Sequence, residues 1–182
     1  MTPSFRPLLL AAALCLAATG HAAAQASMSD AFKGFGSNTR DPIQIEADSL
    51  EVRDREAFAL FSGNVQVRQK DTVLRTARLR VFYEGKAAEG SPTTSQRIRR
   101  FEAEGRVSIS QGDQSVAGDS GWFDMRADQA LLTGGVVLTQ GKNVAKGEKL
   151  TIDLKSGQYR LDSGAPGKGR VQIVIEPTQG KP

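Results

Sequence analysis

The sequence of 182 residues is poor in the residue types that most enzymes and metal sites need. It contains one cysteine, Cys15, and one histidine, His21, and both lie close to the N-terminus. The rest of the chain therefore offers no disulfide, no thiol nucleophile, no histidine base and neither of the two best zinc ligands. These absences argue against a thiol enzyme, a histidine-dependent enzyme and a structural zinc site.

The N-terminal segment has the composition of an export signal. Arg6 is its one charged residue, residues 8–19 form a short apolar run, and two overlapping A-x-A motifs follow. This order predicts a cleaved secretory signal over residues 1–26, cut after Ala24 or Ala26. The apolar run is shorter than the ~20 residues that a membrane-spanning helix needs. A buried N-terminal helix is the alternative interpretation.

The charge of the chain says little about its partners. Without Arg6 it carries 23 Lys and Arg against 20 Asp and Glu, a net charge of +3, and such a small excess more often serves solubility than binding. With one Trp and no stacking array, nucleic acid is not expected as a partner. The chain has two arginine clusters, Arg75, Arg78, Arg80 and Arg97, Arg99, Arg100. The paired N–H donors of a guanidinium group suit phosphate, but a solvated face is the plainer interpretation of these clusters.

From Asp41 onward, apolar and polar residues alternate almost everywhere, as in IQIEADSLEV, NVQVRQ and KLTIDL. Short alternating runs separated by Gly, Asp and Asn predict antiparallel strands with one buried face, and no stretch carries a helical stripe. We therefore expect an all-β protein with one domain over residues 41–177. A flexible leader over residues 27–40 and a flexible tail over residues 178–182 flank it, and the Gly- and Ser-rich residues 84–96 predict a long loop.

One face of this alternation supplies a candidate apolar interior. Its residues are mostly aliphatic, and periodicity alone allows either a sandwich core, which is the plainer interpretation, or the lining of a space for an apolar ligand. The candidate interior residues are Ile43, Ile45, Leu50, Val65, Val67, Leu79, Val81, Val107, Ile109, Phe123, Met125, Val136, Leu138, Leu150, Ile152, Val171 and Ile173.

A pattern of glycine, two alternating aliphatic residues and glutamine occurs three times. We expect each glycine at a corner that needs positive φ or a kink. Units that bury one face only by stacking on the next unit predict an elongated molecule. The three glycine and glutamine pairs are Gly63 and Gln69, Gly105 and Gln111, and Gly134 and Gln140.

The carboxylates of the chain do not predict a catalytic or metal site. Asp48, Asp119 and Glu148 recur at similar positions of the repeat, but their spacing matches no calcium loop, so turn chemistry is the better explanation. Two carboxylates can suffice for glycoside hydrolysis, yet here they are scattered through turns. The sequence also lacks a phosphate-cradling Gly-Lys motif. We expect no enzyme, no cofactor and no metal.

The motifs resemble those of the OstA-type family of lipopolysaccharide transport proteins. The resemblance runs from DPIQIEADSLEV through FSGNVQVRQ and LLTGGVVLTQ to GEKLTIDLKSGQYRL and GRVQIVIEP. It implies an open, slightly twisted antiparallel β-jellyroll of about fifteen short strands. In that fold, two walls of strands enclose the lipid A acyl chains while lipopolysaccharide crosses the periplasm from the inner to the outer membrane. The candidate interior residues would line this path.

The resemblance also implies partners. They are lipopolysaccharide with its lipid A, an LptC-type protein anchored in the inner membrane, the N-terminal domain of an LptD-type outer-membrane protein, and other copies of the chain joined head to tail. An open sheet leaves edge strands that can join another chain by strand addition. We expect these joints at the first and last strands, residues 43–52 and 171–176, through Ile43, Ile45, Val171, Ile173 and Ile175.

Two sequence features favour a periplasmic bridging member of this family over its membrane-anchored and barrel-bearing relatives. They are the expected cleaved signal and the end of the chain at Pro182. The rival interpretation is an exported carbohydrate-binding or structural β module. Sugar-binding platforms use Trp and Tyr faces, and this chain has only Trp122, Tyr83 and Tyr159 to supply them.

Overall fold

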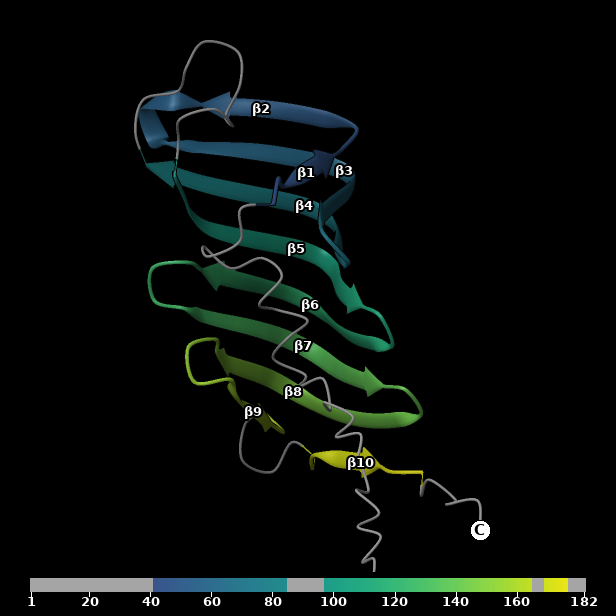
Figure 1. Cartoon of the computed structure of the whole chain (residues 1–182). Helices are drawn as coiled ribbons and strands as arrows, with labels where there is room; N and C mark the ends of the chain where they lie inside the picture. Colours follow the sequence, from purple (N-terminus) through teal and green to yellow (C-terminus); the bar gives the residue numbers. More distant parts are fainter. Residues whose placement is uncertain (1–40, 85–96, 165–168, 177–182) are drawn as a thin grey trace, which may run out of the picture.

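The structure, a computed structural model, describes residues 41–84, 97–164 and 169–176, which form one antiparallel sheet of ten strands (Figure 1). The expected signal, leader and tail lie outside these residues, as does most of the expected loop. The elements are β1 (Gln44–Glu46), β2 (Ser49–Arg53), the 3-10 turn η1 (Asp54–Glu56), β3 (Phe58–Gln69), β4 (Thr72–Glu84), β5 (Arg97–Gln111), β6 (Gln114–Asp124), β7 (Gln129–Gln140), β8 (Asn143–Asp153), β9 (Gln158–Asp162) and β10 (Gln172–Val174).

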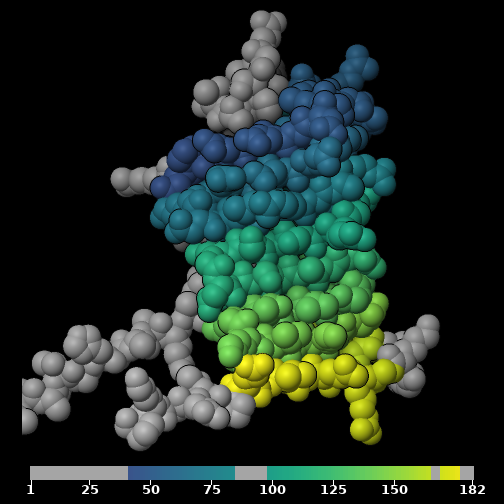
Figure 2. Space-filling view, turned by 90° about the vertical axis from the view of Figure 1, so that its right-hand side faces the viewer, coloured from purple at the N-terminus to yellow at the C-terminus, as the bar shows by residue number. Residues whose placement is uncertain are grey.

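The sheet is a meander in which β3 to β8 pair in sequence order. The alternation of apolar and polar residues explains this pairing. Each strand has an apolar face, and the neighbouring strands and the opposite side of the fold cover it. Figure 2 shows the result, a stack of strands that runs in chain order from β1 and β2 at one end to β10 at the other. Within the described ranges, no helix is long and apolar enough to cross a membrane.

Three long strands bend where the repeated glycines lie. The φ angles are 79° at Gly63, 85° at Gly105 and 83° at Gly134, which confirms the predicted positive φ. At each glycine the register shifts, so that two residues of the bent strand oppose one residue of its neighbour. This two-against-one arrangement is a β-bulge, which bends a strand and increases its twist.

The expectation of about fifteen short strands is not met, because the described residues form ten strands and the longest, β5, has 15 residues. The physical reason is that each repeated glycine bends a strand without ending it. Backbone pairing resumes on both sides of the bulge, for example at Ser62 with Arg78 and at Val65 with Thr76. The all-β, antiparallel and open character of the sheet is as expected.

The bends divide the sheet into two walls that are joined along the line of bulges. The first wall consists of β2, β9 and residues 58–62, 78–84, 97–104, 120–124, 129–133 and 149–153. The second wall consists of β1, β10 and residues 65–69, 72–76, 107–111, 114–118, 136–140 and 143–147.

The expected first strand, residues 43–52, is two strands. It breaks at Asp48, whose backbone N–H donates to the carbonyl of Gly63 at 2.9 Å, so β1 and β2 pair with opposite halves of β3. The far end of the sheet has the same construction, since β9 and β10 pair with opposite halves of β8. Each wall therefore contributes one edge strand at each end of the sheet.

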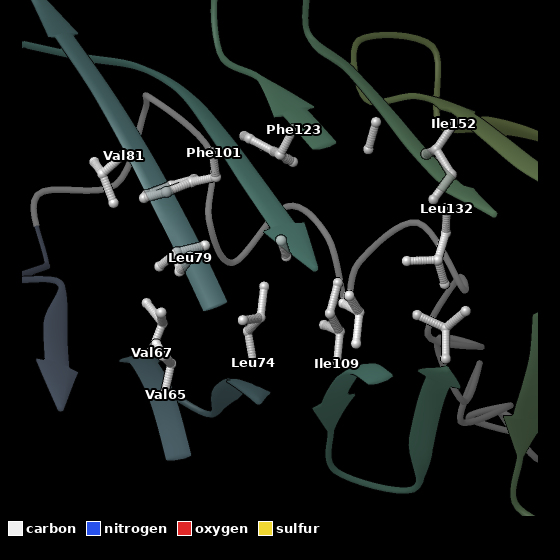
Figure 3. Packing of buried hydrophobic residues seen from close by; sticks show 14 of the residues in the cluster. Val65, Val67, Leu74, Leu79, Val81, Phe101, Ile109, Phe123, Leu132 and Ile152 are labelled. Atoms are coloured by element: carbon white, nitrogen blue, oxygen red, sulfur yellow. The ribbon is translucent and has the colours of Figure 1, made fainter. Parts of the chain in front are cut away.

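The hydrophobic core lies between the two walls. In Figure 3, Val81, Phe101, Phe123 and Ile152 come from the first wall and point toward Val67, Leu74 and Ile109 of the second wall. Leu79, Val136 and Leu150 have no exposed surface. Burying such a side chain stabilises the fold by about 1.5–3 kcal/mol, so the facing walls are the main source of stability.

Candidate binding site between the two walls

Most of the predicted interior residues are buried in this core. Ile43, Ile45 and Met125 are half-buried and pack against it from its margins. Their burial follows from the register, because directly opposite residues in neighbouring strands share one face of the sheet. The predicted residues that the structure buries are Val65, Val67, Leu79, Val81, Val107, Ile109, Phe123, Val136, Leu138, Leu150 and Ile152.

Several core residues were missed by the sequence analysis. On β4 the inward residues are Leu74 and Thr76 on one side of the bend and Leu79 and Val81 on the other, so the alternation changes phase at Ala77. A repeated glycine on the neighbouring strand marks this phase change and was the available signal. The missed core residues are Ala59, Phe61, Leu74, Tyr83, Phe101, Ala103, Val116, Ala130 and Leu132.

The interior contains a cavity of about 190 Å³ at the end formed by β1 and β2. Its lining comes from both walls, since β1 belongs to the second wall and β2 to the first. The lining residues are Ile43, Ile45, Leu50, Ala59, Phe61, Val81, Tyr83 and Ile98.

Tyr83 is the one polar side chain in this lining. Its hydroxyl donates to Asp54 Oδ1 at 3.1 Å, and Asp54 lies in η1 beside the cavity. Burial of the hydroxyl, together with the hydrogen bond to the carboxylate, raises the pKa of Tyr83. The phenol therefore stays neutral, and the surface that faces the cavity remains apolar.

The middle of the interior is filled. Phe101 of β5 and Phe123 of β6 occupy directly opposite positions, and their ring centroids are 6.4 Å apart with planes tilted by 47°. Leu74 and Ile109 approach the rings from the second wall. The spaces that remain around the rings are about 30 Å³ and 20 Å³, so the interior is wide at the β1 and β2 end and narrow at its centre.

Both ends of the interior expose apolar side chains. At one end Leu50 is 50% exposed on β2, and at the other Ile173 is 64% exposed on β10. Both lie on the inner face, since Leu50 is opposite Phe61 and Ile173 is opposite Ala145. Among the described residues, the edge strands β1, β2, β9 and β10 each have a strand neighbour on one side only.

The predicted interior residues Leu50, Val171 and Ile173 are more exposed than the rest. Val171 is 38% exposed, and Leu50 and Ile173 face inward but are at least half exposed, because within the described residues no further strand lies beside the ends of the sheet. Of the expected edge residues, Ile45 lies on β1 and Ile173 on β10, whereas Ile43, Val171 and Ile175 flank these strands.

The described arginines of the two clusters, Arg75, Arg78, Arg80, Arg99 and Arg100, lie on the outer face. Arg80 and Arg100 both pair with Glu102, at 3.1 Å and 2.9 Å. Arg100 also stacks 4.5 Å above the ring of Trp122. Engagement with acidic and aromatic neighbours on the outside of the sheet agrees with the solvated-face interpretation of these arginines.

The repeated carboxylates lie along the line of bulges. The side-chain amide of Asn64 donates to Asp48 Oδ2 at 2.9 Å, and the backbone N–H of Gly135 donates to Glu148 Oε2 at 3.3 Å. Asp119 packs against Gly134, where a Cβ atom would overlap it. These contacts are turn and bulge chemistry, and the described residues contain no group of three side chains able to hold a metal ion.

The fold and the site define a class of protein: an open, bent antiparallel sheet whose inner face is a continuous apolar surface exposed at both ends. Residues 44–158 match the family described as LptA/(LptD N-terminal domain) LPS transport protein. A relative from Rhizobium meliloti (strain 1021), named only as an uncharacterized protein, is 37% identical over 179 residues, which cover 94% of each chain. The chain belongs to this lipopolysaccharide transport family and is of its LptA type, as the motifs indicated.

A solved structure has the same fold. It is LptH from Pseudomonas aeruginosa, described as the LptA homologous periplasmic component of the conserved lipopolysaccharide transport device. The match has a TM-score of 0.59 and 19% sequence identity, and it covers 75% of this chain and 96% of LptH. At this identity the likeness concerns the architecture of the sheet.

Proposed function

We propose that the protein is a periplasmic lipopolysaccharide-binding bridge. In this role it holds the lipid A acyl chains between its two walls and passes lipopolysaccharide from an inner-membrane complex toward the site of outer-membrane assembly. The observation that carries the proposal is the continuous apolar inner face, which begins at an open cavity beside β1 and β2 and ends in exposed apolar residues on β9 and β10.

The energetics of acyl-chain binding fit this interior. Transfer of each CH₂ group from water to an apolar environment is favourable by about 0.8 kcal/mol, provided that no unpaired polar group faces the chain. The cavity lining is aliphatic and aromatic, and its one hydroxyl, on Tyr83, is already paired with Asp54. Acyl chains would enter at this end and displace side chains as they move toward the centre.

The edge strands are the proposed joints with partners. β1 and β2 at one end, and β9 and β10 at the other, would add to the sheets of an LptC-type protein, of the N-terminal domain of an LptD-type protein, or of another copy of the chain. Such addition would cover the exposed Leu50 and Ile173 and continue the apolar surface into the partner. The role is binding and transfer, with no catalytic residue and no cofactor.

The carbohydrate-binding alternative finds little support in the positions of the aromatic residues. Tyr83 is buried inside the cavity, and Trp122 on the outer face is covered by the guanidinium of Arg100. Tyr159 is exposed, on β9 at the far end of the sheet. These side chains do not form one platform.

Native mass spectrometry of the protein purified from a Gram-negative host separates the two functions. The proposal predicts a population of molecules with the added mass of lipopolysaccharide, lost when Ile45 in the cavity lining is replaced by Asp. The matched control is Arg78→Asp on the outer face, which should keep the lipid. Protein that carries no lipid but binds oligosaccharides would contradict the proposal.

A further inference from the structure

A row of polar side chains crosses the second wall beside the turns that join its strands. Each residue of the row is directly opposite the next in the sheet, from β3 through to β8. Residues two positions away, such as Val67, Leu74 and Ile109, are buried in the core. Since alternate residues of a strand share a face, the row lies on the inner face. This polar row consists of Gln69, Thr72, Gln111, Gln114, Gln140 and Asn143.

Three residues of the polar row are deeply buried, whereas Gln111 and Gln140 are half-buried and Asn143 is exposed. Gln69, Thr72 and Gln114 are 2%, 0% and 3% exposed, and buried polar groups destabilise a fold unless hydrogen bonds satisfy them. At the ends of the row the bonds go to the segments beside β1 and β10. Gln69 Nε2 donates to the carbonyl of Asp41 at 2.9 Å, and Asn143 Oδ1 accepts from the backbone N–H of Glu176 at 3.1 Å.

Two neighbouring residues of the row carry oxygen atoms with unused hydrogen-bonding capacity. Among the described residues, Thr72 Oγ1 and Gln111 Oε1 are buried with no hydrogen-bond partner, and the two residues are directly opposite each other on β4 and β5. Valine fits a buried strand position as well as threonine does, so packing does not require the hydroxyl. The pair thus presents two neutral oxygen atoms beside the apolar side chains of Leu74 and Ile109.

The chemistry of this pair selects its ligand. A carboxamide oxygen accepts hydrogen bonds, and a hydroxyl both accepts and donates them, so a neutral donor satisfies both oxygens. A phosphate would need a cation, and the row contains no Lys or Arg. A ligand that joins acyl chains to a donor group would place the chains on the apolar wall and the donor at the row.

We propose that Thr72 and Gln111 bind a neutral hydrogen-bond donor of the lipid, an amide N–H or a hydroxyl at the junction between its acyl chains and its sugar headgroup. This inference rests on the proposed lipopolysaccharide-binding function and adds a specificity site to it. Polar groups placed at the edge of an apolar pocket fix the orientation of a ligand and distinguish it from analogues that lack the matching group.

The test uses Thr72→Val and Gln111→Met, which remove the oxygen atoms and keep the approximate shape of each side chain. Because each change removes an unpaired buried polar atom, the thermal unfolding midpoint should stay the same or rise. Ser110→Ala is the matched control, since it removes a hydroxyl from the outer face of β5 beside Gln111. Binding is measured with lipopolysaccharide and with short-chain phosphatidylcholine, which has no hydrogen-bond donor.

We expect each variant to bind lipopolysaccharide about threefold to tenfold more weakly, with unchanged affinity for phosphatidylcholine and no effect of Ser110→Ala. An alkyl glucoside, which has hydroxyls but no amide, distinguishes the two possible donors. If the variants bind the glucoside more weakly than the wild type does, the donor is a hydroxyl. If their affinity for the glucoside is unchanged, the donor is the amide N–H. Unchanged affinity for lipopolysaccharide, or an equal loss for both lipids, overturns the inference. Wild-type protein that binds no lipopolysaccharide contradicts the proposed function itself, which is a different result.

Discussion

Phe101 and Phe123 face each other across the ladder between β5 and β6, with their ring centroids 6.4 Å apart, and close the middle of an interior that is open at its ends. On one side of the pair lies the cavity of about 190 Å³, and beside the rings only about 20–30 Å³ remains. Acyl chains that pass from end to end must displace these rings. The pair is therefore a narrow point of the proposed path.

Replacement of Phe123 by Leu should widen this point. We expect a loss of about 1–3 kcal/mol in the free energy of unfolding, measured in urea, because a buried ring is shortened. Transfer of a fluorescent lipid to a second protein should become faster, measured by stopped flow. Val116→Ala is the control, since Val116 is buried but lines none of the spaces around the rings. Equal acceleration by both variants, or none by Phe123→Leu, would contradict the role of the ring pair.

Replacement of Gly63 by Ala should be more harmful than replacement of Gly112. Both glycines have positive φ, but a Cβ atom at Gly63 would overlap the Asp48 side chain, whereas nothing lies within 4 Å of one at Gly112. We expect Gly112→Ala to cost about 1–2 kcal/mol from backbone conformation alone. Gly63→Ala should cost more, measured by urea unfolding. Equal losses in the free energy of unfolding would contradict this prediction, because the close approach of Asp48 to Gly63 would then add nothing to the effect of the substitution.

The Tyr83 phenol predicts a dependence of stability on alkaline pH. Its pKa is raised in the folded protein by burial and by Asp54, so above the ordinary value of 10.0 the unfolded chain loses this proton first. The protonated Tyr83 hydroxyl therefore contributes fully to the free energy of unfolding below about pH 10. This contribution is lost as the pH rises through the pKa that Tyr83 has in the folded protein.

Tyr83→Phe checks this prediction. The unfolding midpoint of the wild type should fall more steeply above pH 10 than that of the variant, because the variant has no proton to lose at this position. The difference in phenolate absorbance between the two proteins should appear only above the ordinary tyrosine pKa. A difference that titrates at or below that value would contradict the buried, Asp54-bonded geometry.

The N-terminal segment gives a prediction that the described residues do not address. The sequence pattern predicts export and cleavage after Ala24 or Ala26, so the mature chain should begin at Gln25 or Ser27. Intact-mass measurement of protein released from the periplasm should give one of these two masses. A mass that includes residues 1–24 would contradict cleavage.

The sequence was sufficient to predict the strands, the repeat and much of the inner face. Val65 and Val67 follow Gly63 with a clean period of two, and the same holds for Val136 and Leu138 after the later glycine, because a strand alternates its faces locally. The positive φ at the repeated glycines was predictable for the same local reason.

Features that depend on neighbouring strands were harder to predict. Phe101 is a core residue because it is opposite Val81 and Phe123, a relationship set by register across three strands. Leu50 has the pattern of an interior residue but is half exposed, because none of the described strands lies on the outer side of β2. Burial at the ends of a sheet depends on what lies beside it, which local alternation does not encode.

Site-specific photo-crosslinking in cells tests the central claim most directly. A photoreactive residue is placed at Ile45 in the cavity, at Phe123 in the centre of the interior and at Arg80 on the outer face, and lipopolysaccharide adducts are detected by immunoblot. We predict adducts at Ile45 and Phe123 and none at Arg80, although Arg80 is the more accessible to solvent. Equal crosslinking at all three positions, or crosslinking at Arg80 alone, would contradict transport between the two walls.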